Sequence, residues 1–208
     1  MRPVTTPRTR APRVTKLSLI VILGMSLGCA TYRGTASATQ PSVAAQEGGW
    51  IKVPHFLLVL QEKNNDCGAA ALAAVERFRG RPVSPASIEA TLGRTDNRLR
   101  AGDIESYARK SGLSSYVFFG TMTDVVHELR HGRPVIVGLA KTFAEKKAIS
   151  HYEVVVGYEP KKKLVLLLDP GRGWQVDSLT GFAEEWARTK AVTIVAFLPE
   201  SDQRTSER

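Results

Sequence analysis

Apolar positions along the chain predict helices in the first half of the domain and strands in the second. Apolar residues recur with helical spacing over 67–79, 84–92, 103–111 and 123–131, and again at 182–189. Apolar runs predict strands over 115–119, 135–139, 151–158, 163–168 and 192–197. The runs that begin near Val135, Val154 and Leu164 are typical of the central strands of one sheet. Helices followed by strands favour an α+β domain, with helices packed on an antiparallel sheet.

Local signals mark both ends of the first predicted helix, 67–79. Asp66 precedes it and belongs to the residue types that are favoured at an N-cap. Gly80 follows it as a C-terminal stop. The helix is apolar enough to be buried centrally, which would hold its first residue, Cys67, rigidly.

The chain begins with a basic segment that leads into a short apolar stretch, residues 17–28. This stretch is too short for a final membrane anchor, which needs about 20 residues, and the arrangement is typical of a secretory signal peptide. Cys29 follows Gly28 directly, as in a bacterial lipobox. Residues 1–28 are therefore predicted to be a lipoprotein signal peptide and Cys29 to carry lipid. Ordinary secretory cleavage nearby, with Cys29 incidental, is the alternative.

Lipidation of Cys29 predicts a protein anchored to a membrane outside the cytoplasm, because two or three acyl chains hold a protein stably. Ala30 stands where many inner-membrane lipoproteins of Gram-negative bacteria have Asp, which favours the periplasmic side of the outer membrane if the source is Gram-negative. Residues 29–49 are rich in small and polar side chains and are predicted to be a flexible tether. Residues 50–199 form the domain, and residues 200–208 are a polar tail.

The basic charge of the chain belongs largely to the targeting segment. The formal net charge is +9, and five basic residues before position 17 account for more than half of it. The remaining surplus, without aromatic residues interleaved in a basic stripe, does not indicate a nucleic-acid partner. The hydrophobic fraction of 43% is that of an ordinary folded domain.

Cysteine usage singles out Cys67. The chain has two cysteines, and if Cys29 carries lipid, Cys67 is a lone thiol outside the cytoplasm, which is uncommon unless the thiol reacts. In the first turn of a helix, backbone N–H groups and the helix dipole favour a thiolate. Gly68 leaves space beside the sulfur for a substrate backbone. Gln61 precedes Cys67 closely enough for its amide to donate to an oxyanion together with the Cys67 N–H.

A thiolate nucleophile needs a proton partner, and His151 is the best placed of the four histidines. It opens the predicted strand 151–158, so its side chain would lie on a rigid mount at the domain edge. Asp169 ends the next predicted strand, before Pro170-Gly171. If the two strands are antiparallel neighbours, the end of one lies beside the start of the other, and Asp169 can accept a hydrogen bond from His151. A role for Asp169 in the tight turn is compatible with this.

These residues resemble, in order and spacing, the papain-like cysteine peptidases that process bacteriocin leaders, the double-glycine peptidases, and their stand-alone lipoprotein forms. The resemblance spans 53 to about 198 and rests on Gln61, Asp66-Cys67-Gly68, His151-Tyr152 and Asp169-Pro170. It implies a papain-like fold in which Cys67 is the nucleophile and His151 the base. It further implies that Asp169 orients the histidine and that Gln61 is the oxyanion donor. A peptide or protein substrate is implied, and no metal or organic cofactor.

Other functions remain open on the sequence alone. His127-Glu128-Leu129-Arg130-His131 fits the HExxH pattern, in which two histidines on one helix face bind zinc, but no further ligand type follows until Glu145. The domain could also be a lipid-anchored binding module without turnover, or an enzyme that passes its acyl group to an amine. The complete set of Cys, His, Asp and Gln argues against a binding module, but it does not distinguish water from an amine as the acceptor.

Overall fold

The order of helices and then strands is confirmed by the computed structural model of the chain, which describes residues 32–40, 42, 48–93, 98–144 and 148–199. The helices with described bounds are α2 (Cys67–Phe78), α3 (Pro85–Thr91), α4 (Ala101–Lys110), α5 (Met122–Arg130) and α6 (Leu179–Ala187). The strands are β1 (Ser37–Ala38), β2 (Ile51–Lys52), β3 (Ser114–Phe119), β4 (Val135–Lys141), β5 (Ile149–Glu159), β6 (Leu164–Asp169), β7 (Gly173–Ser178) and β8 (Val192–Phe197). In the described ranges, no helix has the length and apolar character to cross a bilayer.

The strands form one antiparallel sheet in the order β1-β7-β6-β5-β4-β8-β3, with β2 paired to β5 beside this path. The three predicted apolar runs are therefore neighbours in its middle, as β4, β5 and β6. Val135, Val154 and Leu167 have no exposed surface, as expected of central strands covered on both faces. This arrangement confirms the predicted α+β class.

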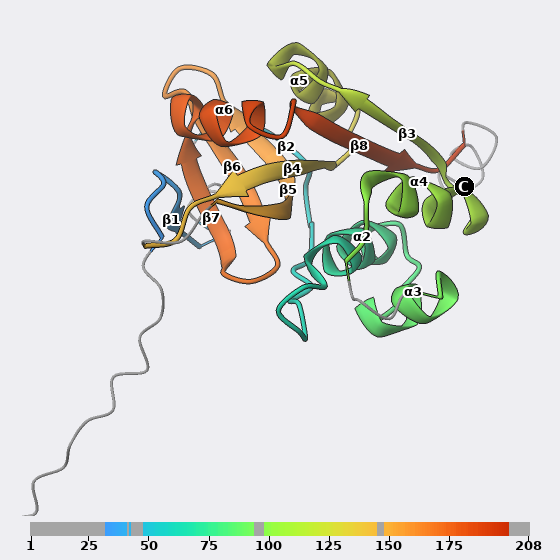
Figure 1. The fold of residues 1–208 in the computed structure, drawn as a ribbon. Coiled ribbons are helices and arrows are strands. Elements are labelled where there is room, and N and C mark those ends of the chain that lie inside the picture. The colour runs from blue at the N-terminus through green and yellow to red at the C-terminus, as the bar shows by residue number, and fades with distance from the viewer. Residues whose placement is uncertain (1–31, 41, 43–47, 94–97, 145–147, 200–208) are drawn as a thin grey trace, which may run out of the picture.

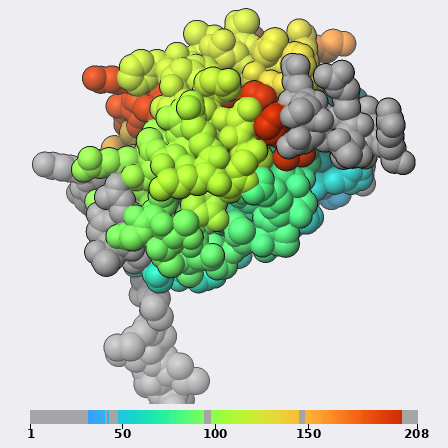
Figure 2. Space-filling view, turned by 90° about the vertical axis from the view of Figure 1, so that its right-hand side faces the viewer, coloured from blue at the N-terminus to red at the C-terminus, as the bar shows by residue number. Residues whose placement is uncertain are grey.

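The helices divide into two groups around the sheet. Figure 1 shows α2, α3 and α4 together on one side of the molecule and α5 and α6 against the sheet. Figure 2 looks onto the first side, where green and yellow-green segments from α2 to α5 form the surface. Within the first group, α2 is buried without interruption from Gly68 to Glu76. The prediction that this helix is central is thus confirmed.

The start of α2 differs in detail from its prediction. Asp66 stands at the N-cap position, but its carboxylate makes no cap hydrogen bond to the helix. It instead accepts from the backbone N–H groups of Glu62 and Lys63, at 3.0 and 3.1 Å, and so closes the turn before the helix. Gly80 follows the helix with φ +74°, a left-handed conformation that glycine adopts without strain, as its predicted role as a stop requires.

The predicted flexible tether is wrong for residues 32–40, which lie on the domain. β1 adds a strand to the free side of β7, and Tyr32 forms an isolated bridge with Phe143. Strand pairing satisfies backbone groups that an edge strand would otherwise expose, which gives this polar segment a reason to dock. The predicted signal peptide 1–28, Cys29 and the tail 200–208 lie outside the described residues, as does most of 41–47.

Candidate active site

The candidate nucleophile, Cys67, is the first residue of α2 and lines a pocket of about 620 Å³. Since α2 is buried along its length, the position of the thiol is fixed by the core. Gly68 has a different role from the one expected of it. A Cβ at this position would lie 3.2 Å from both Leu99 Cβ and Tyr152 Cδ2, so the missing side chain lets α2 pack closely on β5 and the loop before α4.

His151 and Asp169 meet as the sequence predicts. β5 and β6 are antiparallel neighbours in which Val154 lies opposite Leu168, so Asp169 comes beside the start of β5. His151 Nε2 lies 2.7 Å from Asp169 Oδ1. The same carboxylate oxygen accepts the N–H of Gly171 at 2.8 Å. Asp169 therefore both closes the turn after β6 and orients the imidazole.

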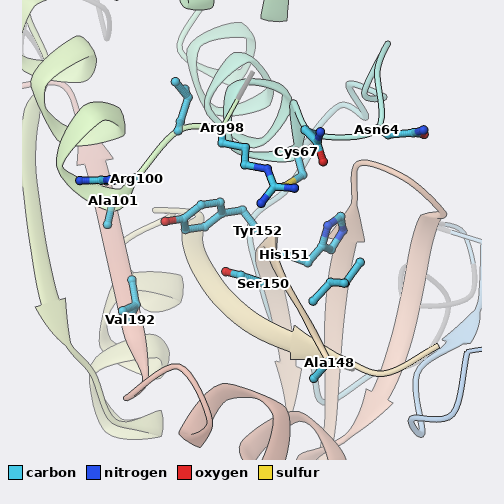
Figure 3. A pocket seen from close by; sticks show the side chains of 13 residues that line it. Asn64, Cys67, Arg98, Arg100, Ala101, Ala148, Ser150, His151, Tyr152 and Val192 are labelled. Atoms are coloured by element: carbon cyan, nitrogen blue, oxygen red, sulfur yellow. The ribbon is translucent and has the colours of Figure 1, made fainter. Parts of the chain in front are cut away.

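The second side of the His151 ring faces Cys67, with which it shares a hydrogen bond. Because Nε2 is taken by Asp169, the nitrogen left for the thiol is Nδ1. Figure 3 shows Cys67 and His151 side by side in the pocket, one from the helical side and one from the sheet. The line Cys67–His151–Asp169 is the arrangement in which a base activates a nucleophile and a third group orients the base.

The electrostatics of this line favour separated charges. Burial raises the pKa of the Cys67 thiol, but the hydrogen bond and charge of His151 and the backbone N–H groups of Tyr152 and Gly68 outweigh it, and the pKa falls below its ordinary value. Burial acts against a charged His151, yet its bonds to Asp169 and Cys67 raise the pKa to about 10. Both shifts favour the ion pair, a thiolate beside an imidazolium, over the neutral pair.

Gln61 lies against the turn that carries Asp169. Its backbone N–H donates to the carbonyl of Pro170 at 2.9 Å. Its Oε1 is buried, and a Cβ on Gly171 would stand 3.3 Å from that oxygen. These contacts tie Gln61 to the turn that follows Asp169, while its service as an oxyanion donor stays a prediction.

The pocket beside Cys67 combines apolar and cationic side chains. Figure 3 shows the Arg98 side chain reaching into it, between Cys67 and Tyr152. Among the described residues, its lining has no carboxylate: Asn64, Asn65, Cys67, Arg98, Leu99, Arg100, Ala101, Ala148, Ile149, Ser150, His151, Tyr152 and Val192. Such a pocket suits a side chain that is neutral or acidic.

The sequence reasoning missed two charged residues behind the pair of His151 and Asp169. Lys141 at the end of β4 and Glu153 on β5 have no exposed side-chain surface, and their charged atoms are 2.9 Å apart. Burial and the nearby Asp169 raise the pKa of Glu153, although the charge of Lys141 opposes them, and the pKa is about 7. Both residues interrupt strands that are otherwise apolar. A charge at such a position needs a partner, and this signal could have found them.

One group of side chains among the described residues has the composition of a metal site. The ligand atoms of His151, Glu153 and Asp169 all lie within 4.8 Å of one another. The two carboxylates of this group are already paired with cations of the protein, Asp169 with His151 and Glu153 with Lys141. Internal ion pairs therefore account for this cluster.

The HExxH pattern forms no comparable group. His127 lies on α5 and His131 directly after it, with ring centroids 4.4 Å apart. His131 Nδ1 faces the carbonyl of His127 at 2.8 Å. No cluster of three metal-ligating side chains in the described ranges includes either histidine. The zinc alternative thus lacks a third ligand there.

Comparison with known proteins gives one family and several solved structures. A model described as the Peptidase_C39 like family matches residues 53–194. No curated protein matches the sequence. The peptidase domain of Streptococcus ComA, a bi-functional ABC transporter involved in a quorum sensing pathway, is 26% identical with a TM-score of 0.58. The alignment covers 70% of this chain and 100% of that domain.

Two further solved structures are similar in fold. A double glycine motif protease from an AMS/PCAT transporter, in complex with the leader peptide, is 20% identical with a TM-score of 0.57, over 73% of this chain and 96% of that chain. Xylellain, a cysteine protease from Xylella fastidiosa, is 12% identical with a TM-score of 0.53, over 81% and 92% of the two chains. The similarity in fold thus covers most of each protein.

Proposed function

Because the chain belongs to the Peptidase_C39 like family of cysteine peptidases, we propose that it hydrolyses peptide bonds through Cys67, His151 and Asp169. The matched residues 53–194 contain all three, and the predicted papain-like fold is confirmed by the solved structures. The observation that supports the proposal is the line of side chains from the Cys67 thiol through the His151 ring, which lowers the pKa of the thiol, to the Asp169 carboxylate 2.7 Å from that ring.

In the first half of the reaction, the thiolate of Cys67 attacks the carbonyl carbon of the scissile bond. The oxyanion of the tetrahedral intermediate accepts hydrogen bonds from the Cys67 N–H at the start of α2 and from the amide of Gln61. The protonated Nδ1 of His151 then gives its proton to the leaving amine, and the C–N bond breaks. The acyl group remains on Cys67 as a thioester.

The second half of the reaction releases that acyl group. Neutral His151 removes a proton from a water molecule, which attacks the thioester carbonyl. The thiolate leaves, the carboxylic acid product departs, and His151 holds the proton again. Asp169 keeps the ring oriented and stabilises its charge in both halves.

The substrate is a peptide or a protein segment that extends across the pocket beside Cys67. Two observations support this substrate class. The pocket of about 620 Å³ is large enough for side chains on both sides of a scissile bond, and a related double glycine motif protease binds a leader peptide. A peptide-processing role follows by analogy with that relative.

Cleavage of a diverse synthetic peptide mixture by the full chain in detergent, followed by mass spectrometry, tests this function. Wild type should yield new termini that are absent with Cys67→Ala and with His151→Ala, because each change removes a reacting group. The loss should be at least about 10³-fold. Cys29→Ser is the matched control, since it removes the other thiol and should cleave normally. Equal cleavage by wild type and Cys67→Ala would reject the proposal.

We also propose that Cys29 carries lipid and holds the domain on the periplasmic side of a bacterial membrane. The support is the basic start, the apolar stretch 17–28 and the position of Cys29 directly after it. Growth with labelled palmitate should label wild type and not Cys29→Ser, and membrane pellets should lose the variant. Labelling of both proteins, or of neither, would contradict lipidation at this residue without affecting the proposed chemistry.

A further inference from the structure

We propose that residues 32–38, here called the N-terminal strap, act with Arg172 to position Asp169 and thereby His151 for catalysis. This inference rests on the proposed function. The strap lies outside the residues 53–194 that the family model matches. Tyr32 and Arg172 are then positioning residues, which act on the reacting groups only through Asp169.

The first connection runs through Arg172, in the turn between β6 and β7. Its Nη1 lies 4.0 Å from Asp169 Oδ2, the oxygen that His151 does not use. The strap holds this guanidinium from the other side. Arg172 Nη2 donates to the carbonyl of Ala36 at 3.3 Å, and the Tyr32 ring lies 4.1 Å from the guanidinium carbon. Without these contacts Arg172 has no fixed place beside the carboxylate.

The second connection runs through the buried charges behind the site. The Tyr32 hydroxyl donates to Glu185 Oε1 at 2.6 Å and accepts from Lys141 Nζ at 3.3 Å. Lys141 Nζ also pairs with Glu185 at 2.8 Å and with Glu153 at 2.9 Å. Tyr32 therefore closes the outer end of a chain of charges whose inner end is Glu153.

Glu153 connects this series of charged groups to the reacting groups. Its carboxylate lies within 4.8 Å of the ligand atoms of both His151 and Asp169. Two ionised carboxylates this close repel one another in a buried site unless a nearby cation compensates their charge. Lys141 supplies this charge, and it helps to lower the pKa of Asp169 as well as that of Glu153. Displacement of Lys141 would remove this effect, so the pKa values of Glu153 and Asp169 would both rise.

The rest of the strap is bound well enough to hold Tyr32 in place. The Thr35 hydroxyl is hydrogen-bonded to Asp177 and lies 3.1 Å from Ser178 Oγ. Ser37 and Ala38 pair with Val176 and Gln175 as β1. The Tyr32 ring also lies against Phe143, with centroids 5.6 Å apart. These contacts fix the strap on the domain.

The rate at which iodoacetamide labels Cys67, followed by mass spectrometry from pH 5 to 9 in the full chain, tests the proposal. Tyr32→Leu removes the second connection and the ring contact of the first, and Arg172→Met removes the guanidinium at similar length. A loosened Asp169 stabilises the imidazolium less, so the labelling midpoint should rise by about one pH unit. Labelling below the midpoint then slows about tenfold. Tyr32→Phe keeps the ring over Arg172 and should shift less than Tyr32→Leu.

Tyr116→Leu is the matched control, because Arg109 lies over Tyr116 at 5.7 Å on the far edge strand β3. It should leave the labelling midpoint unchanged. If Tyr32→Leu does not fold, as judged by thermal unfolding, Arg172→Met decides alone. Folded variants with the midpoint of wild type would overturn the strap's role. An ordinary thiol profile in wild type itself would instead reject the proposed function, so the two failures are distinguishable.

Discussion

The charge on His151 is the feature on which the proposed chemistry depends most. Two partners hold it: Asp169 at 2.7 Å and the thiol of Cys67. Both favour the protonated ring against the effect of burial. Because the ring can give its proton only while it holds one, activity should fall as the pH rises through about 10, the pKa of His151.

Asp169→Asn should lower stability within a definite pH window. The raised pKa of His151 contributes stability that is fully present below pH 6.5 and is lost as the pH rises toward about 10. The lowered pKa of Asp169 contributes above pH 3.8 and is lost as the pH falls through its lowered value. We expect the variant to lose about 1.5–3 kcal/mol between these limits, as for a charge-assisted hydrogen bond. Urea unfolding at several pH values measures this, and a loss independent of pH would contradict it.

Gln61→Ala separates the oxyanion from the base. If the Gln61 amide donates to the oxyanion, peptide cleavage should slow about 10²-fold to 10³-fold. The labelling of Cys67 by iodoacetamide should stay at the wild-type rate, because no oxyanion forms in that reaction. Gln61→Glu, which keeps the shape against Gly171, is the matched variant. Parallel loss of labelling and cleavage would mean that Gln61 acts through the Asp169 turn instead.

The residues of the proposed triad were identifiable from the sequence because each carries a local signal. Cys67 begins an apolar helix, His151 begins an apolar strand and Asp169 ends the next one. Arg172 carries no such signal, and the place of Lys141 in an apolar strand indicates a buried partner without identifying it, since the partners come from segments far away in the chain. Tyr32 lies 109 positions from Lys141, and only the folded structure brings the two together.

At the scale of the element, the packing of α2 on β5 sets the distance between nucleophile and base. Gly68 permits this packing, since Leu99 and Tyr152 occupy the space where a side chain would stand. The backbone of Tyr152 is one of the groups that lower the pKa of the Cys67 thiol. A change in the separation of α2 and β5 should therefore alter the pKa of the Cys67 thiol directly.

Gly68→Ala should destabilise the protein and raise the pKa of Cys67. Overpacking a core contact costs about 1–3 kcal/mol, and the better helix propensity of alanine offsets about 1 kcal/mol. Gly102→Ala is the matched control, because Gly102 is also the second residue of its helix and a Cβ there would meet nothing within 4 Å. Chemical unfolding should show a net loss of up to about 2 kcal/mol for Gly68→Ala and a small gain for Gly102→Ala. A gain in stability for both variants would contradict this, because it would show that Leu99 and Tyr152 move away from the added methyl group at little cost.

Elements with a regular apolar pattern were predictable, and those without one were not. β4, β5 and β6 each contain an apolar run and were found. β7 was missed because the residues that it buries, Gln175 and Asp177, are polar. The Gln175 amide nitrogen donates to the carbonyls of Arg172 and Trp174. The buried face of β7 is therefore polar and hydrogen-bonded, where the buried face of a strand is usually apolar.

At the scale of the whole molecule, the charge around the pocket should influence which peptides bind. Arg98 and Arg100 line it, and no carboxylate does in the part of the chain that the structure describes. We expect peptides with Glu beside the scissile bond to be cleaved faster than those with Gln, and both faster than those with Lys. Like charges at an interface slow association, so the Glu to Lys ratio of kcat/KM should be about tenfold at low salt and should shrink as salt is added. Arg98→Glu with Arg100→Glu should reverse the order, and an unchanged order would contradict this.

Domain organisation was only partly predictable. Composition identified residues 29–49 as polar and small, and such segments commonly remain flexible. Composition does not record that β7 offers a free edge or that Tyr32 fits between Arg172 and Lys141. The domain therefore begins well before Trp50, and a protein that starts at Gly49 would lack the strap that is proposed to position Asp169.

The most direct test of the account is the labelling of Cys67 by iodoacetamide from pH 5 to 9 in wild type and His151→Ala. An activated pair predicts rapid labelling that persists well below the ordinary pKa of a thiol, about 8.5, and that the variant loses. Slow labelling with an ordinary thiol profile in both proteins would mean that His151 does not activate Cys67, and it would contradict the central claim.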